Sequence, residues 1–289
     1  MLTARWEAGR GWDAPTITPL ARISLDPTSK VLHYAQTIFE GMKAFRGVDD
    51  RVRLFRPDLN MQRMNRSASR AHLPAFAPDQ LLECIRRLVL VDEAWIPYST
   101  SSSLYIRPAI IGTEGALGLA PSREALLFVV MTPVASYYST GAPRPVSLLC
   151  NPDYVRAFPG GAGDTKLGSN YAPTFVVQGA AAREGCDQVL WVQGEDRALA
   201  EVGAMNIFLV LRGPGGRKTL VTPALDGTVL PGVTRRSVID MLRASAQVDA
   251  VEERKITLDE VLAAQKEERL LEMFGTGTAV TVSPVGMLR

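Results

Sequence analysis

The sequence predicts an α+β protein of two domains, and three observations lead to this fold class. At 289 residues, the chain exceeds the usual size of a small single domain and can bury a large core. Segments with strand and helix patterns are mixed along the chain, without the regular alternation that builds a doubly wound parallel sheet. The stretch SYYSTGAPRP interrupts both patterns. We therefore expect a small N-terminal domain over 1–135, a connecting loop over 136–145 and a larger C-terminal domain over 146–289.

Two helices are expected in the first domain. The segment that begins at Pro57 carries Leu59, Met64 and Ala68 at helical spacing, after a proline that suits a first helical turn. From Pro78 onward, the apolar residues follow the i, i+1, i+4, i+7, i+8 pattern of an amphipathic helix that faces a core. Runs of apolar and β-branched residues predict strands at 51–55, 104–111 and 125–134.

The second domain is expected to hold strands and three helices. The same strand pattern occurs at 146–150, 188–193, 206–211 and 219–223. Helices are expected over Tyr171–Glu184 and Thr234–Leu242. A third helix begins at Thr257, where TLDE fits a capping box with Glu260 at its third position.

Composition and charge argue against several classes of function. The 32 basic and 30 acidic residues give a net charge of +2, so the overall charge does not favour binding to nucleic acid or to an anionic membrane. The longest apolar run, at 125–131, is too short to span a bilayer, and the N-terminus lacks the apolar core of a secretory signal. The three separated cysteines suit reduced core thiols better than a disulfide framework or a metal site. We expect a soluble cytoplasmic protein that binds small molecules.

Several stretches carry residues that suit chemistry. Lys166 lies among small turn-forming residues in AGDTKLGSNYAP, with Tyr171 five positions later. Glu201 precedes a strong strand that could carry it into the interior, where a carboxylate needs a cationic partner. The Pro-Gly turn before Val233 and Thr234 would open a helix whose free amides favour a phosphate.

A further phosphate cradle is possible at FGTGTAV, residues 274–280, where two glycines and two threonines could gather amides and hydroxyls around an anion. Each of these features also has an ordinary structural reading, as a surface lysine, a strand turn or a helix cap. Together they supply a lysine for an imine, two phosphate cradles, an arginine on a helix, a tyrosine and a carboxylate. These are the groups that pyridoxal phosphate requires.

Seven motifs in order along nearly the whole chain carry a resemblance to a known family. They are LHYAQTIFEGMKAFRG (32–47), LFRPDLNMQRM (54–64), SLYIRPAIIGTE (103–114), GDTKLGSNYAPT (163–174), LAEVGAMNIF (199–208), LPGVTRRS (230–237) and FGTGTA (274–279). In these motifs the chain resembles the branched-chain amino acid aminotransferases, which are fold-type IV pyridoxal phosphate enzymes. The resemblance implies a two-domain α+β fold of that type.

The resemblance also implies roles for individual residues in binding pyridoxal 5′-phosphate. In the family, the lysine of the K-L-G motif holds the cofactor's aldehyde as a Schiff base, which makes Lys166 the expected catalytic residue. Tyr171 would hydrogen-bond the phenolic oxygen of the cofactor, and Glu201 would pair with its protonated ring nitrogen. The residues implied to hold the phosphate are Arg63, Val233, Thr234 and Thr278.

The implied reaction is reversible amino transfer between L-leucine, L-isoleucine or L-valine and 2-oxoglutarate. Arg107 would reach the distal carboxylate of glutamate or 2-oxoglutarate. The other residues implied to contact substrate are Tyr34, Phe39, Tyr105, Thr278 and Ala279. In family members a loop of the partner subunit, near Leu119 here, completes the pocket, so the resemblance implies a homodimer.

Some of the same motifs also occur in proteins with other functions. D-amino acid transamination or aminodeoxychorismate lyase chemistry would keep Lys166 and Glu201 but needs different residues to bind the substrate carboxylate. The motifs YIRP and FEGMKAFRG argue against both activities. A binding module that had lost its chemistry would have no use for the intact lysine, tyrosine and glutamate. Charge and motifs give no support to a structural or nucleic-acid-binding protein.

Overall fold

The computed structural model describes residues 1–99, 101–135 and 144–289, which form two compact units. The first unit comprises Met1–Ser136 and Thr165–Tyr171, and the second comprises Tyr137–Asp164 and Ala172–Arg289. Most of the expected connecting loop at 136–145 lies outside the described residues. The segment that carries Lys166 was expected in the C-terminal domain, whereas its contacts group it with the first unit.

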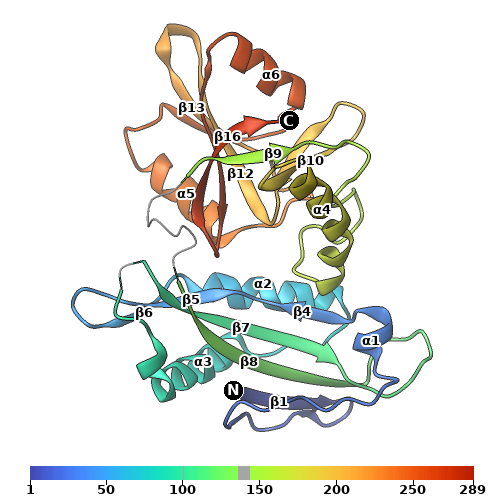
Figure 1. Ribbon diagram of the computed structural model, residues 1–289. Helices are drawn as coiled ribbons and strands as arrows, with labels where there is room; N and C mark the ends of the chain where they lie inside the picture. The colour runs from blue at the N-terminus through green and yellow to red at the C-terminus, as the bar shows by residue number, and fades with distance from the viewer. Residues whose placement is uncertain (100, 136–143) are drawn as a thin grey trace. The chain divides into compact units, whose positions relative to one another are not determined.

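An eight-stranded antiparallel sheet forms the first unit (Figure 1). Its main path runs in the order β2-β1-β8-β7-β5-β6, with β3 beside β1 and β4 beside β7. The strands are β1 (Leu2–Glu7), β2 (Gly11–Trp12), β3 (Thr16–Ile17), β4 (Thr37–Phe39), β5 (Met42–Arg46), β6 (Val52–Leu54), β7 (Ser103–Gly112) and β8 (Glu124–Val134). The strands predicted at 51–55, 104–111 and 125–134 are confirmed as β6, β7 and β8.

Both helices expected in the first unit are present, and their apolar faces pack against the sheet. The helices are α1 (Lys30–Tyr34), α2 (Pro57–Arg70), α3 (Pro78–Val91) and a short 3-10 helix at Glu93–Trp95. Prolines occupy the first turns of α2 and α3, where a missing N–H costs no hydrogen bond. Met64 of α2 and Ile85 of α3 share one buried cluster with Ile106 of β7. Periodicity therefore selected the buried faces correctly.

The second unit is built on a mixed sheet that closes on itself. Its order is β11-β10-β9-β16-β15-β12-β13-β14, and a further pairing of β11 with β12 joins the two ends of the six-strand path from β11 to β12. The strands are β9 (Val146–Leu149), β10 (Gln188–Gln193), β11 (Ala198–Val202), β12 (Met205–Arg212), β13 (Lys218–Thr222), β14 (Ala250–Glu253), β15 (Leu270–Gly277) and β16 (Thr281–Leu288). The four strands predicted in this region are confirmed as β9, β10, β12 and β13.

In the described part of this unit, three α-helices accompany the sheet, namely α4 (Phe175–Arg183), α5 (Val233–Arg243) and α6 (Leu258–Lys266), together with a short 3-10 helix at Pro214–Gly216. The prediction that a helix starts at Tyr171 is wrong, because 3-10 turns at Gly168–Asn170 and Ala172–Thr174 precede α4. Pro173 explains the difference, since a proline disfavours the α conformation in the residue before it. The regular helix begins only after this proline. The α5 prediction is confirmed to within a residue at each end.

The predicted cap of α6 is half right. Thr257 is its N-cap, and the Glu260 backbone N–H donates to the Thr257 hydroxyl at 3.1 Å. In a complete capping box the Glu260 carboxylate would bond back to the cap residue. Here that carboxylate instead accepts two hydrogen bonds from Arg254, at 2.9 and 2.6 Å.

Candidate active site

Lys166 lies in a loop that is fastened to the first unit through its own backbone. The Lys166 N–H donates to the Ser67 hydroxyl at 2.9 Å, and its carbonyl accepts from the Phe39 N–H at 3.2 Å. A Cβ at Gly168 would lie 2.5 Å from Cγ2 of Thr37, so the close approach of this loop to β4 requires glycine there. The small residues around the lysine therefore allow a tight fit of the loop against the sheet.

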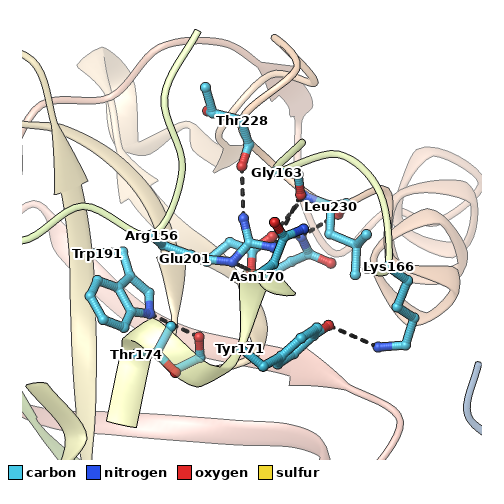
Figure 2. Close-up of polar contacts among 12 residues, drawn as sticks. Arg156, Gly163, Lys166, Asn170, Tyr171, Thr174, Trp191, Glu201, Thr228 and Leu230 are labelled. Carbon is cyan, nitrogen blue, oxygen red and sulfur yellow. Dashed lines mark hydrogen bonds and ion pairs between the residues drawn. The ribbon is translucent and has the colours of Figure 1, made fainter. Parts of the chain in front are cut away.

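The amine of Lys166 sits in an aromatic environment. Its Nζ donates to the Tyr171 hydroxyl at 3.1 Å (Figure 2) and lies 4.4 Å from the centre of the Phe39 ring. Burial lowers the pKa of Lys166 to about 8, helped by the charges of Arg63 and Arg107 and opposed by Glu40. Near physiological pH an amine with this pKa is still mostly protonated, but its neutral fraction, the form that acts as a nucleophile or a general base, is far larger than that of an ordinary lysine.

Arg63 is held by a buried glutamate that the sequence did not reveal. Glu40 is 0% exposed, and its two oxygens accept from Arg63 Nε at 2.7 Å and Nη2 at 2.8 Å. Asn60 donates to the same carboxylate at 2.9 Å. Burial acts to raise the pKa of Glu40, but the charge and hydrogen bonds of Arg63, with smaller effects of Lys166 and Asn60, outweigh it and lower the pKa. The pair fixes the Arg63 guanidinium on α2.

Tyr105 and Arg107 lie two residues apart on β7 and so point to the same face of the sheet. Arg107 Nη2 donates to the Tyr105 hydroxyl at 3.0 Å, and the guanidinium carbon lies 4.8 Å from the centre of the Phe39 ring. A Cβ at Gly41 would lie 2.1 Å from the Tyr105 hydroxyl, so only glycine leaves room for that ring.

Arg107 has no acidic partner among the residues that the structure describes. None of the ion pairs found among them includes Arg107, and its buried Nε makes no hydrogen bond there. A partly buried cation without a counter-charge is costly. The side chain therefore offers a place for an anionic group.

Tyr34 lies apart from these residues. It ends α1, and its hydroxyl donates to the Leu117 carbonyl. Together with Leu119 and Leu167 it lines a hollow of about 350 Å³ on the first unit. Within the described part of the chain, no contact joins Tyr34 to the cluster of Phe39, Tyr105 and Arg107. Leu119 itself is 86% exposed.

Glu201 belongs to the second unit and is 2% exposed. Glu201 precedes β12, as predicted, but it also lies within a strand that was not predicted, β11, which pairs with β10 on one edge and with β12 on the other. Its Oε1 accepts from the Leu230 N–H at 2.7 Å, and its Oε2 pairs with Nε of Arg156 at 2.9 Å (Figure 2). The sequence correctly indicated a buried carboxylate but not that Arg156 is its partner.

The remaining predicted residues lie at two chain turns of the second unit. Val233 and Thr234 form the first turn of α5, whose N-cap, Gly232, has no side chain to accept from the helix amides. Thr278 and Ala279 lie in the turn between β15 and β16, where Gly277 pairs with Thr281. The first turn of a helix and a turn between strands are places where backbone amides can bind anions. The predicted site residues thus form two groups, one in each unit.

The residues that the structure describes hold neither a metal-binding cluster nor a membrane-spanning helix. No group of three or more His, Cys, Asp and Glu side chains there is arranged to hold a metal ion. No helix in this part of the chain has both the length and the apolar character needed to cross a bilayer.

Comparison with known proteins gives consistent results. A family model described as amino-transferase class IV matches residues 37–287. The branched-chain-amino-acid aminotransferase of Monosiga brevicollis is 53% identical over 289 residues, which is 100% of this chain and 74% of that relative. The cytosolic branched-chain-amino-acid aminotransferase of Ovis aries is 52% identical over 288 residues, again covering 100% of this chain and 74% of the relative.

Solved structures agree with these sequence relatives. The crystal structure of the T.th. branched-chain amino acid aminotransferase with pyridoxamine 5′-phosphate matches with a TM-score of 0.76 at 25% identity, over 99% of this chain and 85% of that chain. The Escherichia coli branched-chain amino acid aminotransferase matches with the same TM-score of 0.76 at 24% identity, over 99% of this chain and 86% of that chain. The predicted fold-type IV α+β architecture is confirmed by these matches.

Proposed function

The chain belongs to the branched-chain-amino-acid aminotransferases, within the class IV amino-transferases, and from this premise we propose that Lys166 is the residue that holds pyridoxal 5′-phosphate. Its activity is the transamination of branched-chain amino acids. The observation that carries the assignment of Lys166 is its amine, which donates to Tyr171 at 3.1 Å and has a pKa lowered to about 8.

The residues of both units fit the cofactor's chemical groups. Lys166 supplies an amine for the aldehyde carbon, and Tyr171 supplies a hydroxyl for the phenolic oxygen. Glu201 supplies a buried carboxylate for the ring nitrogen. The cation and the amides for the phosphate come from Arg63, Val233, Thr234 and Thr278. When bound, the cofactor supplies the electron sink that this reaction needs at the substrate Cα.

Lys166 is the proton carrier in this proposal. Its neutral amine would take the proton from the substrate Cα and, as a general acid, would return it to the carbon that carries the cofactor's aldehyde. Such proton transfer works best when the pKa lies near the operating pH. The hydrogen bond to Tyr171 limits the directions in which the amine can point. Lys166 moves a proton, whereas Glu201 keeps one in place: as an ionised hydrogen-bond acceptor it keeps the ring nitrogen protonated.

The substrate pocket must accept both an aliphatic side chain and a carboxylate. Phe39 and Tyr105 provide aromatic walls that separate leucine, isoleucine and valine by only about 1–3 kcal/mol per methylene. Arg107, which has no acidic partner among the described residues, suits the distal carboxylate of glutamate or 2-oxoglutarate. The backbone amides of Thr278 and Ala279 suit the α-carboxylate that all these substrates share.

We propose that the protein acts as a homodimer. The loop near Leu119 is exposed and is tied to α1 by Lys30 and Tyr34, which donate to the carbonyls of Gly118 and Leu117. A tethered, exposed apolar loop suits a role in completing the pocket of a second subunit. We also propose a cytoplasmic location. Relatives from Ovis aries and Mus musculus that are named cytosolic support it, and a relative from Bos taurus is named mitochondrial.

The test combines turnover with chemical trapping. The purified protein should transaminate L-leucine and L-valine with 2-oxoglutarate, and borohydride reduction should leave the cofactor's mass on the peptide that contains Lys166. Lys166→Ala should lower kcat by at least about 10²–10⁴-fold, the usual contribution of general acid–base catalysis. Lys255→Ala, which removes a lysine whose side chain is 65% exposed, is the control and should keep full activity. Turnover of D-alanine alone, or an active Lys166→Ala variant, would contradict the proposal.

A further inference from the structure

Arg156 is a buried arginine that joins three separate parts of the second unit. Its side chain is 5% exposed, and its Nε lies 2.9 Å from Oε2 of Glu201. Its Nη1 donates to the Thr228 carbonyl at 2.8 Å, and its Nη2 donates to the Gly163 carbonyl at 3.1 Å. Figure 2 shows the guanidinium between these acceptors. Each of its three nitrogens therefore has a partner.

The two carbonyl acceptors are themselves held in place. A Cβ at Gly163 would lie 2.6 Å from the Thr228 carbonyl oxygen and 2.4 Å from Cβ of Ala157, so the chain at Gly163 runs directly against both. This close packing leaves the guanidinium little freedom to shift. The Nε–H of Arg156 is consequently aimed at Glu201 by contacts that do not involve Glu201.

The two oxygens of the Glu201 carboxylate meet donors of different kinds. Oε1 accepts from neutral groups, the Leu230 N–H at 2.7 Å and the Asn206 amide at 3.5 Å, whereas Oε2 pairs with the cation Arg156. A carboxylate that is 2% exposed would be driven toward its protonated form by burial alone. A cation in direct contact lowers the pKa of a carboxylate by about 1–3 units. Arg156 is in position to supply this charge.

We propose that Arg156 is a positioning residue that keeps Glu201 ionised, so that the shared proton resides on the ring nitrogen of bound pyridoxal 5′-phosphate rather than on the carboxylate. The inference rests on the proposed function. A carboxylate and a ring nitrogen compete for one proton, and no electrons or other groups are exchanged. Because Arg156 touches the carboxylate itself, its charge acts most strongly there and favours the ionised pair.

Two substitutions separate the charge of Arg156 from its hydrogen bonds. In Arg156→Gln, the amide nitrogen stands as many bonds from Cα as Nε does, so a neutral hydrogen bond to Glu201 is kept while the charge is lost. In Arg156→Lys, the charge is kept, but the paired bonds to Thr228 and Gly163 cannot both be made. Arg197→Gln serves as the control, since Arg197 pairs with Asp259 near the surface with its side chain 41% exposed.

The direct readout is the nitrogen-15 NMR signal of ring-labelled pyridoxal 5′-phosphate bound to each protein. We expect the protonated value in the wild type, in Arg197→Gln and in Arg156→Lys at neutral pH. In Arg156→Gln the signal should move toward the neutral-nitrogen value, because the proton equilibrium changes by about 10- to 1000-fold. A wild-type signal in Arg156→Gln, or equal displacement in the Gln and Lys variants, would overturn the proposal.

The Lys variant gives an independent test if Arg156→Gln does not fold. A lysine can lose its charge at alkaline pH, whereas an arginine cannot. The ring-nitrogen signal of Arg156→Lys should therefore move toward its neutral value as the pH rises, while the wild-type signal stays constant. Identical pH profiles would overturn the inference.

Borohydride trapping on the same samples separates the two proposals. Cofactor mass on the Lys166 peptide in all variants, with unchanged ring-nitrogen signals, would overturn the role of Arg156 alone. Absence of that mass in the wild type would overturn the proposed function.

Discussion

Opposing electrostatic effects set the pKa of the Lys166 amine. Burial and the charges of Arg63 and Arg107 push the pKa of Lys166 down, and Glu40 opposes them. Glu40 can do so because it stays ionised in the interior, where Arg63 bonds both of its oxygens. One buried ion pair therefore orients a cation and also limits how far the pKa of the neighbouring lysine falls.

We predict that Lys166→Met stabilises the cofactor-free protein at neutral pH. Folding lowers the pKa of Lys166 to about 8 from 10.5, so between these two values the unfolded chain binds more protons and stability rises with pH. Below pH 8 the folded state carries the full cost of a desolvated ammonium. Methionine removes this cost, so the free energy of unfolding should increase by about 3 kcal/mol at pH 7. Urea unfolding between pH 7 and pH 10.5 measures the difference.

The expected gain should vanish near pH 10.5, where the lysine is neutral in the folded state and its unfolded pKa is reached. Lys255→Met, at a lysine whose side chain is 65% exposed, is the matched control and should give no such gain. Equal stability of Lys166→Met and wild type at neutral pH would mean that the amine is not desolvated, and the lowered pKa would have no basis.

The sequence singled out residues that we propose to act on the cofactor, but not the residues that hold them in place. Lys166, Tyr171 and Glu201 stand out because a lysine in a small-residue loop and a carboxylate next to a strand are unusual. Glu40 and Arg156 carry no such signal, because an ion pair depends on two side chains that meet only in the fold. Glu40 lies 23 residues from Arg63, and nothing local marks either as the partner of the other.

At the level of elements, helices with a regular apolar period were predictable, and so were strands with a long apolar run, such as β10 and β12, whereas β11 was not. α2 and α3 begin at proline and keep one apolar face, so their first residues and their buried faces follow from the sequence. In β11, all five residues are buried, which removes the alternation that marks a strand with one solvated face. The closure of the second sheet through β11 therefore could not be foreseen.

The cap of α6 allows a prediction about one element. Thr257→Ala removes the acceptor of the Glu260 N–H and leaves a helix amide unsatisfied, so we expect a loss of about 0.5–2 kcal/mol in the free energy of unfolding. Thr257→Ser keeps the hydroxyl and should recover most of the loss. Urea denaturation followed by circular dichroism measures both. If Ala and Ser gave the same midpoint, the hydroxyl would contribute nothing as a cap.

At the scale of the whole molecule, the residues in our proposal are divided between the two units. The first contains Lys166, Tyr171, Arg63 and Arg107, which suit the reactive amine and the anionic groups. The second contains Glu201 and the turns at α5 and at β15–β16, which suit the ring nitrogen and the phosphate. The chain covers 74% of its Monosiga and Ovis relatives, so these assignments concern the region that they share.

The exposed loop around Leu119 provides the test of the assembly. If this loop completes the pocket of a second subunit, Leu119→Glu should raise the KM for leucine while leaving the Lys166 adduct intact, because the loop and the lysine then serve different sites. A Lys166→Ala subunit should have no turnover in its own site but should still supply a normal loop to the site of its partner. Co-expression of the two variants should therefore create mixed dimers with one complete site, at about a quarter of the wild-type site density if subunits pair at random. Activity at low leucine that stays at the mean of the two separate variants would exclude a pocket shared between subunits.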